Sequence, residues 1–200
     1  NDLIHRDLKP SNVMLMDIKG HDNFVKLFDF GVVKFAKTSD DGDLTRQGTM
    51  LGTPRYMAPE QILAPEKVLF AADIYSLGLI FFHMFTGKKP FEEYSSNDIM
   101  LQKIQGNLSE PSKDLNLPKS MCDLYTRMTD KDPEQRPSAE EVVTTLNALE
   151  TELKVSTWSG SRPISLPNQG FWGNRSNIIL IFLLLIVVAM GWGIWVTKQT

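Results

Sequence analysis

This chain of 200 residues contains little cysteine and histidine, and its basic residues do not outnumber its acidic ones. The single cysteine, Cys122, leaves no pair for a disulfide bond within the chain, so a disulfide-stabilised scaffold is excluded. Three histidines and one cysteine form no spacing typical of a metal-ligand set. The 21 Lys and Arg against 24 Asp and Glu give a net charge of −3, so we expect no nucleic-acid partner.

Charged residues are also missing from one long stretch near the C-terminus. Residues 178–196 read IILIFLLLIVVAMGWGIWV, and seventeen of these nineteen residues are hydrophobic. At a helical rise of ~1.5 Å per residue the stretch is about 28 Å long, close to the ~30 Å hydrocarbon core of a bilayer. We therefore expect a transmembrane helix here that contacts membrane lipid, with Trp172, Trp192 and Trp195 near the two interfaces.

The rest of the chain divides around this stretch. Residues 1–153 have the mixed polar and apolar pattern of a globular unit, whereas residues 154–177 are rich in Ser, Gly, Pro and Asn and are typical of a linker. Residues 197–200 form a short tail. Because residue 1 is Asn rather than Met, we expect the chain to be a fragment of a longer protein.

The globular part is expected to be mainly α-helical, with one small β-hairpin. Two short apolar runs, at 13–16 and 24–28, flank turn residues and predict the hairpin. Apolar residues at three- and four-residue spacing predict helices over 72–86, 97–105, 119–129 and 138–153. Gly87 is expected to end the first of these helices, and Ser138 with Glu141 is expected to form a capping box that begins the last.

Five motifs follow one another through residues 1–150. They are HRDLKPSN at 5–12, DFG at 29–31, GTPRYMAPE at 52–60, DIYSLG at 73–78 and DPEQRP at 132–137. In this order the set resembles eukaryotic-like (Hanks-type) serine/threonine protein kinases, in particular membrane-anchored bacterial ones. The resemblance implies the helical C-terminal lobe of the protein kinase fold, beginning at its catalytic loop and followed by one transmembrane helix. The N-terminal lobe of that family, which holds the ATP α- and β-phosphates, is expected upstream of Asn1.

The resemblance also implies roles in transferring the ATP γ-phosphoryl group to Ser and Thr hydroxyls of protein substrates. Asp7 is expected to orient the hydroxyl and accept its proton, and Lys9 to contact the phosphoryl group. Asn12 and Asp29 are expected to bind Mg²⁺ through hard oxygen ligands. The implied cofactors are ATP and Mg²⁺, with Lys9, Asn12 and Asp29 as binding residues, and the implied activity is that of a non-specific serine/threonine protein kinase.

Regulation and support are implied for a second group of residues. An Arg directly before Asp7 is typical of kinases whose activation loop is ordered by a phosphothreonine, and Thr45 and Thr49 are the candidates to pair with Arg6. Structural roles are implied for His5, Phe30, Thr53, Glu60, Asp73 and Arg136. Among these, Glu60 and Arg136 are expected to form an ion pair, and Asp73 to bind the backbone of the catalytic loop.

Two questions stay open at this point. A catalytically silent pseudokinase, acting as a membrane docking module, is the alternative to an active enzyme, although Asp7, Lys9, Asn12 and Asp29 are all intact. The oligomeric state is also open, with a dimer of the full-length protein as one alternative. We expect a single-pass protein of a bacterial inner or plasma membrane, with the kinase part in the cytoplasm, where ATP is available.

Overall fold

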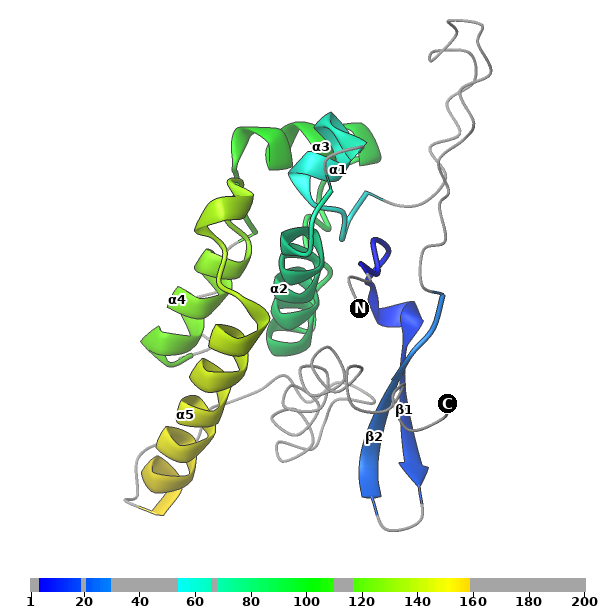
Figure 1. Cartoon of the computed structure of the whole chain (residues 1–200). Helices are drawn as coiled ribbons and strands as arrows, with labels where there is room; N and C mark the ends of the chain where they lie inside the picture. The colour runs from blue at the N-terminus through cyan, green and yellow to red at the C-terminus, as the bar shows by residue number, and fades with distance from the viewer. Residues whose placement is uncertain (1–3, 19–20, 30–53, 66–67, 110–116, 159–200) are drawn as a thin grey trace, which may run out of the picture.

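The computed structural model describes residues 4–18, 21–29, 54–65, 68–109 and 117–158. These residues form a group of helices around α2 and a two-stranded β-ribbon beside it (Figure 1). The elements in chain order are η1 (Pro10–Asn12), β1 (Val13–Ile18), β2 (His21–Leu27), α1 (Pro59–Leu63), α2 (Ala71–Thr86), α3 (Ser96–Gln105), α4 (Lys119–Met128), η4 (Pro133–Gln135) and α5 (Ala139–Trp158). The predicted mainly helical fold with a small hairpin is therefore confirmed.

The ribbon is longer than the apolar runs predicted. β1 and β2 pair antiparallel from Val13 opposite Leu27 to Ile18 opposite His21, with a register irregularity between Met16 and Ile18. Asp17 and the polar residues 21–23 thus belong to strands rather than to the turn. A backbone ladder satisfies its own N–H and C=O groups, so an exposed ribbon can continue through polar residues.

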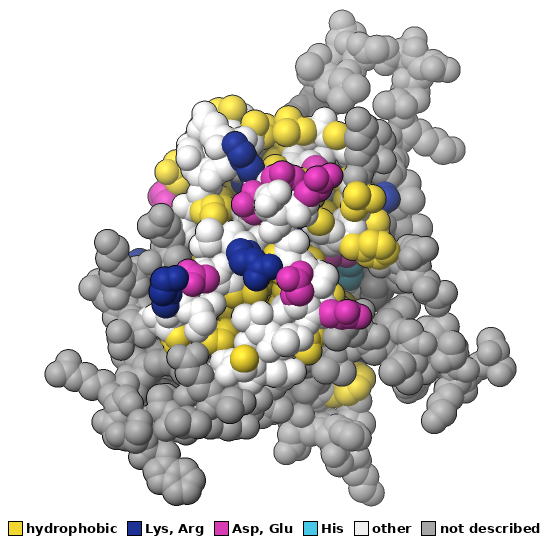
Figure 2. All heavy atoms as spheres, turned by 60° about the vertical axis from the view of Figure 1, so that its left-hand side comes forward, with side chains coloured by type: hydrophobic (Ala, Val, Ile, Leu, Met, Phe, Trp, Pro, Cys, Tyr) yellow, Lys and Arg dark blue, Asp and Glu magenta, His cyan; other side chains and the backbone are white. Residues whose placement is uncertain are grey.

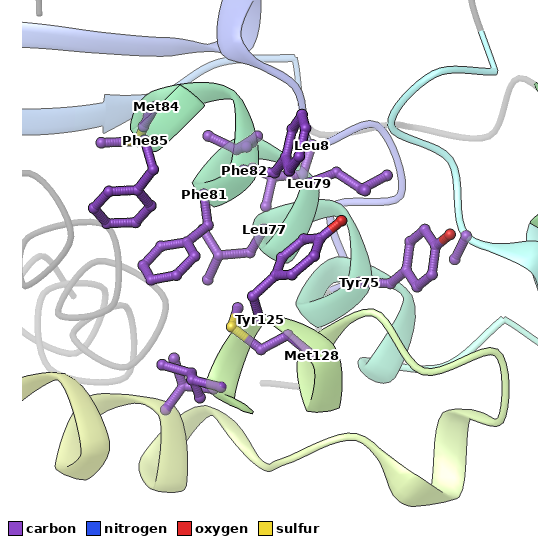
Figure 3. Close-up of a cluster of buried hydrophobic side chains, with 14 of the residues drawn as sticks. Leu8, Tyr75, Leu77, Leu79, Phe81, Phe82, Met84, Phe85, Tyr125 and Met128 are labelled. Carbon is purple, nitrogen blue, oxygen red and sulfur yellow. The ribbon is translucent and has the colours of Figure 1, made fainter. Parts of the chain in front are cut away.

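Helix α2 lies at the centre of the core. Twelve of its sixteen residues are buried, including Tyr75, Phe81 and Phe85. Side chains from α4 face it, and the Tyr125 ring lies 5.7 Å from the Phe82 ring (Figure 3). A helix that is apolar on all sides needs such cover, because each fully buried large side chain contributes about 1.5–3 kcal/mol.

Close packing of α2 against α4 depends on one glycine. A Cβ atom at Gly78 would lie 2.7 Å from Thr129 Cγ2 and 3.0 Å from Met128 Cβ. Both distances are shorter than ordinary van der Waals contacts, so a larger residue would force the two helices apart. Gly78 therefore has a packing role within the predicted motif at 73–78.

The predicted helix ends agree with the structure at three of four helices. α2 ends at Gly87 in a left-handed conformation with φ of 67°, as glycine readily allows. The predicted capping box is present, since Ser138 N–H donates to Glu141 Oε2 at 2.8 Å and Glu141 N–H donates to Ser138 Oγ at 3.2 Å. α5, however, continues to Trp158, five residues beyond its predicted end, because no Gly or Pro interrupts residues 154–158. The first residues of the predicted linker are thus helical.

Helix α1 was not predicted. It is only five residues long, which is too short for a period of three or four residues to be visible. Pro59 at its first turn has the fixed φ that suits a helix start, and this was the available signal.

The predicted membrane span at 178–196 lies outside the described residues. Within the described residues, no helix has both the length and the apolar character needed to cross a bilayer. On the face shown in Figure 2, acidic and basic side chains lie next to one another. The structure also contains two exposed ion pairs, Lys119–Asp123 and Arg127–Glu141, which are screened by solvent and contribute little to stability.

Candidate active site

Two polar side chains of the predicted catalytic loop bind the carboxylate of Asp7. Lys9 Nζ donates to Asp7 Oδ2 at 2.7 Å. Asn12 Nδ2 donates to the Asp7 backbone carbonyl at 2.8 Å and to Asp7 Oδ2 at 3.2 Å. The Asp7 side chain remains 51% exposed, so the carboxylate is oriented by its neighbours and still accessible to a substrate. This arrangement can hold a hydroxyl group and accept its proton.

Asp73, the third residue of α2, binds the backbone of the loop. Its two carboxylate oxygens accept the backbone N–H groups of His5 at 2.7 Å and of Arg6 at 2.9 Å. The contact expected between Asp73 and the loop backbone is therefore present. Burial raises the pKa of the Asp73 carboxyl, and the two backbone N–H bonds oppose this shift because they favour the charged form.

His5 is buried and fixed in one tautomer by its partners. The backbone N–H of Asp7 can only donate, so His5 Nδ1, at 3.3 Å, is the acceptor. The backbone carbonyl of Phe28 can only accept, so His5 Nε2, at 3.0 Å, carries the proton. His5 thus ties the loop before Asp7 to the end of β2.

Asn12 and Asp29 lie at the same end of the ribbon. Val13 pairs with Leu27, and Phe28 N–H donates to the Asn12 carbonyl at 2.9 Å, so Asn12 lies beside the end of the ladder and Asp29 follows one residue after Phe28. Asp29 is exposed and has a φ of 52°, a conformation that a non-glycine residue adopts only where its surroundings require it. Such residues occur often at functional sites.

This pair suits Mg²⁺ by its chemistry. Because the Asn12 amide NH₂ donates to Asp7, its oxygen Oδ1 is the atom available to a metal. Within the described part of the chain, no three His, Cys, Asp or Glu side chains are grouped as a metal site. Mg²⁺ nevertheless needs few protein ligands, because it keeps several waters and shares phosphate oxygens of its substrate. Asn12 and Asp29 would hold such an ion.

The segment after the predicted activation loop is held by side chains at successive positions. Arg55 Nη1 donates to the Pro90 carbonyl. The Tyr56 hydroxyl lies 2.8 Å from His83 Nδ1, and Ser76 Oγ donates to the Tyr56 carbonyl at 2.8 Å. Burial raises the pKa of Tyr56 to about 12 and lowers the pKa of His83, so a neutral hydroxyl donates to a neutral imidazole.

A bidentate ion pair anchors the start of α1. Arg136 Nη1 and Nη2 donate to the two oxygens of Glu60 at 2.6 and 2.8 Å. The Arg136 side chain is completely buried and also donates to the carbonyls of Asp130 at 2.7 Å and of Ala71 at 2.8 Å. The expected Glu60–Arg136 pair is therefore present, and its fixed fork geometry joins α1, α2 and the loop before α5.

A buried lysine lies behind the same segment. Lys103 of α3 is 1% exposed, and its Nζ donates to the Met57 carbonyl. The ammonium lies 4.9 Å from the Tyr75 ring centre and 5.4 Å from that of Phe91, at distances typical of cation–π contacts. Desolvation nonetheless dominates and holds the pKa of Lys103 well below its ordinary value of 10.5. The charges of Arg55 and Arg136 lower this pKa further.

The lowered pKa of Lys103 makes stability depend on pH. Between the lowered pKa and 10.5, the unfolded chain holds a proton on Lys103 that the folded chain has released. We therefore expect the free energy of unfolding to rise with pH in this range, by at most about 1.4 kcal/mol per pH unit. Urea unfolding followed by circular dichroism, at pH values below the ordinary tyrosine pKa of 10.0, measures this slope.

Two lysine variants separate the effect of the buried lysine from the effect of removing any positive charge. Lys103→Met should remove the contribution of this residue to the slope. Lys88→Met, at an exposed lysine, is the control for removing one positive charge. Equal slopes in the wild type and in Lys103→Met would show that this lysine does not release its proton on folding.

Other predicted residues lie outside the described residues. They are Phe30, Thr45, Thr49 and Thr53. The pairing of Thr45 or Thr49 with Arg6 and the structural roles of Phe30 and Thr53 therefore stay predictions. Arg6 itself is half-buried, with a φ of 63°, directly before Asp7.

Lys103 and Gln61 were missed by the sequence analysis, although each has a weak signal. Lys103 follows the buried Ile99 by four positions and so lies on the apolar face of its helix. Gln61 is three residues after Ala58, the spacing at which a side chain caps a helix start, and its Oε1 accepts the Ala58 N–H at 2.8 Å.

Comparison with known proteins finds a matching family profile and similar proteins. The sequence profile of the family described as "Protein kinase domain" matches residues 1–146. Serine/threonine-protein kinase pkn3 of Myxococcus xanthus is 36% identical over 155 residues, covering 75% of this chain and 28% of that protein. Serine/threonine-protein kinase PkaA of Streptomyces coelicolor is 33% identical over 147 residues, covering 74% of this chain and 26% of that protein.

A fungal protein is similar to the same degree. Serine/threonine protein kinase ypkA of Aspergillus fumigatus is 38% identical over 137 residues, covering 68% of this chain and 20% of that protein. The chain thus spans less than a third of the length of each of these three relatives.

Proposed function

The chain belongs to the protein kinase domain family, and from this membership we propose that the protein containing it is a serine/threonine protein kinase. Its reaction is the transfer of the ATP γ-phosphoryl group to Ser and Thr hydroxyls of protein substrates. The observation that carries the proposal is the set of contacts at Asp7, where Lys9 and Asn12 both bind the oxygen Oδ2. The names of the bacterial and fungal relatives support the substrate class.

Each residue of the site has a separate role in phosphoryl transfer. Asp7 Oδ1 is the oxygen that we assign to the substrate hydroxyl, whose proton it accepts as the new O–P bond forms and the bond to ADP breaks. Lys9, 2.7 Å from Asp7, places a cation beside the reacting group. Asn12 and Asp29 would hold Mg²⁺, which supplies charge neutralisation on the phosphates when bound. Preorganised charges of this kind stabilise the transition state without covalent catalysis.

The test is phosphate transfer by two forms of the protein. The full-length gene product, incubated with Mg²⁺ and ATP radiolabelled in its γ-phosphate, should label serine and threonine in itself and in an added protein substrate. The 200-residue chain alone should transfer none, because its five motifs do not include the glycine-rich loop with which the family covers the ATP phosphates. A silent full-length protein that still folds would favour the alternative of a pseudokinase docking module. Robust transfer by the 200-residue chain would contradict the need for an upstream lobe.

We also propose that residues 178–196 anchor the protein in a membrane, with residues 1–177 in the cytoplasm. The support is the uncharged stretch of nineteen residues and the supply of ATP on the cytoplasmic side. A reporter enzyme that is active only outside the cytoplasm, fused after Thr200, should be active in membranes. A silent reporter in a well-expressed fusion would contradict this topology.

Regulation through the predicted activation loop is a further part of the proposal. A phosphate on Thr45 or Thr49 would pair with the guanidinium of Arg6, since an Arg readily binds phosphate oxygens. Treating the full-length enzyme with a phosphatase should then lower its activity, and mass spectrometry should locate the lost phosphate in this loop. Full activity after complete dephosphorylation would contradict this regulation.

A further inference from the structure

The peptide unit between Arg6 and Asp7 is held at both of its polar atoms. On one side, the Asp7 N–H donates to His5 Nδ1 at 3.3 Å. On the other side, the Arg6 carbonyl accepts a hydrogen bond of 2.7 Å from Gln61 Nε2. Because a peptide unit is planar, these two bonds together set the orientation of the plane from which the Asp7 side chain projects.

Arg6 gives this second bond particular importance. Its φ of 63° lies in the left-handed region, which is unfavourable for a non-glycine residue and persists only where surrounding contacts hold it. The Arg6 N–H is bound by Asp73 Oδ1 at 2.9 Å, on the other side of this φ torsion. Gln61 therefore completes a set of three contacts that fix the backbone directly before Asp7.

Only one orientation of the Gln61 side-chain amide allows it to bind the loop. Its Oε1 accepts the Ala58 N–H at the start of α1, at 2.8 Å, so its NH₂ group points to the Arg6 carbonyl. One amide thus links the first turn of α1 to a loop 55 positions earlier in the chain. The neighbouring Glu60 is fixed by Arg136, which holds α1 in place for this contact.

We infer that Gln61 is a positioning residue for phosphoryl transfer, acting on Asp7 through the Arg6 carbonyl. This inference rests on the proposed function, because it assigns Gln61 to the orientation of the proposed base. Gln61 itself is not expected to touch ATP or the substrate. Its loss should therefore lower kcat and leave the KM for ATP unchanged.

Two substitutions separate the two bonds of Gln61. Gln61→Glu keeps an oxygen for the Ala58 N–H and loses the donor to Arg6, whereas Gln61→Met loses both bonds. Gln102→Glu is the matched control, since the Gln102 side-chain oxygen also accepts a hydrogen bond, from Asn107 at 2.8 Å, and glutamate keeps that acceptor. All three variants are made in the full-length protein, and urea unfolding checks that each is folded.

The first readout is steady-state phosphate transfer. We expect kcat to fall about three- to tenfold in Gln61→Glu and Gln61→Met, the loss that one neutral hydrogen bond produces, and to stay at the wild-type value in Gln102→Glu. Wild-type kcat in a folded Gln61→Glu variant would overturn the inference, because Gln61 would then only cap α1.

The second readout does not need activity. Hydrogen–deuterium exchange of the peptide that covers residues 4–9 should be faster in Gln61→Glu than in the wild type and unchanged in Gln102→Glu. Unchanged exchange in Gln61→Glu would also overturn the inference. If the wild-type protein transfers no phosphate, the proposed function fails by itself, and the exchange experiment still decides whether Gln61 holds the loop.

Discussion

Replacing Arg136 by leucine is expected to lower the free energy of unfolding by about 3–5 kcal/mol. The substitution leaves the Glu60 carboxylate, whose side chain is only 14% exposed, without the two hydrogen bonds of its partner. It also leaves the carbonyls of Ala71 and Asp130 without the guanidinium that binds them. The unpaired Glu60 charge carries a desolvation cost, and each of the two carbonyls loses one hydrogen bond, so the effects add in the same direction.

Urea unfolding followed by circular dichroism measures this loss. Arg127→Leu is the matched control, because it removes an arginine that is half exposed and pairs with Glu141 at 3.3 Å. The control should lose no more than about 1 kcal/mol. A double variant, Glu60→Leu with Arg136→Leu, should be less destabilised than the sum of the two single variants, since neither charge is then left alone. Equal losses in Arg136→Leu and Arg127→Leu would contradict the account of this pair.

The Arg136→Leu substitution should also affect the backbone of the proposed active site. Arg136 holds Glu60 at the start of α1, and Gln61 of the same helix binds the carbonyl before Asp7. A folded Arg136→Leu protein should therefore show faster hydrogen exchange in residues 4–9 as well as in α1.

Local patterns predicted most of the secondary structure. The three- and four-residue spacing identified α2, because its buried side chains continue over four turns, and the pairing of Ser138 with Glu141 located the start of α5. The hairpin was predicted too short, and α1 was missed, since neither polar strand residues nor a five-residue helix leave a clear apolar period.

Some contacts of the site were predicted from the sequence, and others were not. The contact of Asp73 with the loop backbone and the Glu60–Arg136 pair were expected from the resemblance to protein kinases. The contacts of Lys103 with Met57 and of Gln61 with Arg6 were not, because they join residues 46 and 55 positions apart that no motif links. Such contacts depend on how the helices pack, and the local sequence does not specify that packing.

The largest effect on activity is expected from Asp7→Asn in the full-length protein. The asparagine keeps the size of the side chain and an oxygen for Lys9 and Asn12, but it cannot accept a proton from the substrate hydroxyl. We expect kcat to fall by roughly 10²–10⁴-fold, the usual contribution of a general base. Stability should change little, because the Asp7 side chain is half exposed.

Asp123→Asn is the control for this substitution. Asp123 is also an exposed aspartate with a lysine partner, Lys119 at 2.6 Å, and it lies on α4 rather than in the loop. The variant should keep wild-type kcat. This control excludes a general effect of removing one surface carboxylate.

The rate of radiolabelled phosphate transfer to a protein substrate, compared between wild type and Asp7→Asn, tests the central claim most directly. The account predicts transfer to serine and threonine by the full-length wild type, and a fall of roughly 10²–10⁴-fold in Asp7→Asn with an unchanged KM for ATP. A folded Asp7→Asn protein that transfers phosphate at the wild-type rate would contradict the claim that Asp7 is the catalytic base.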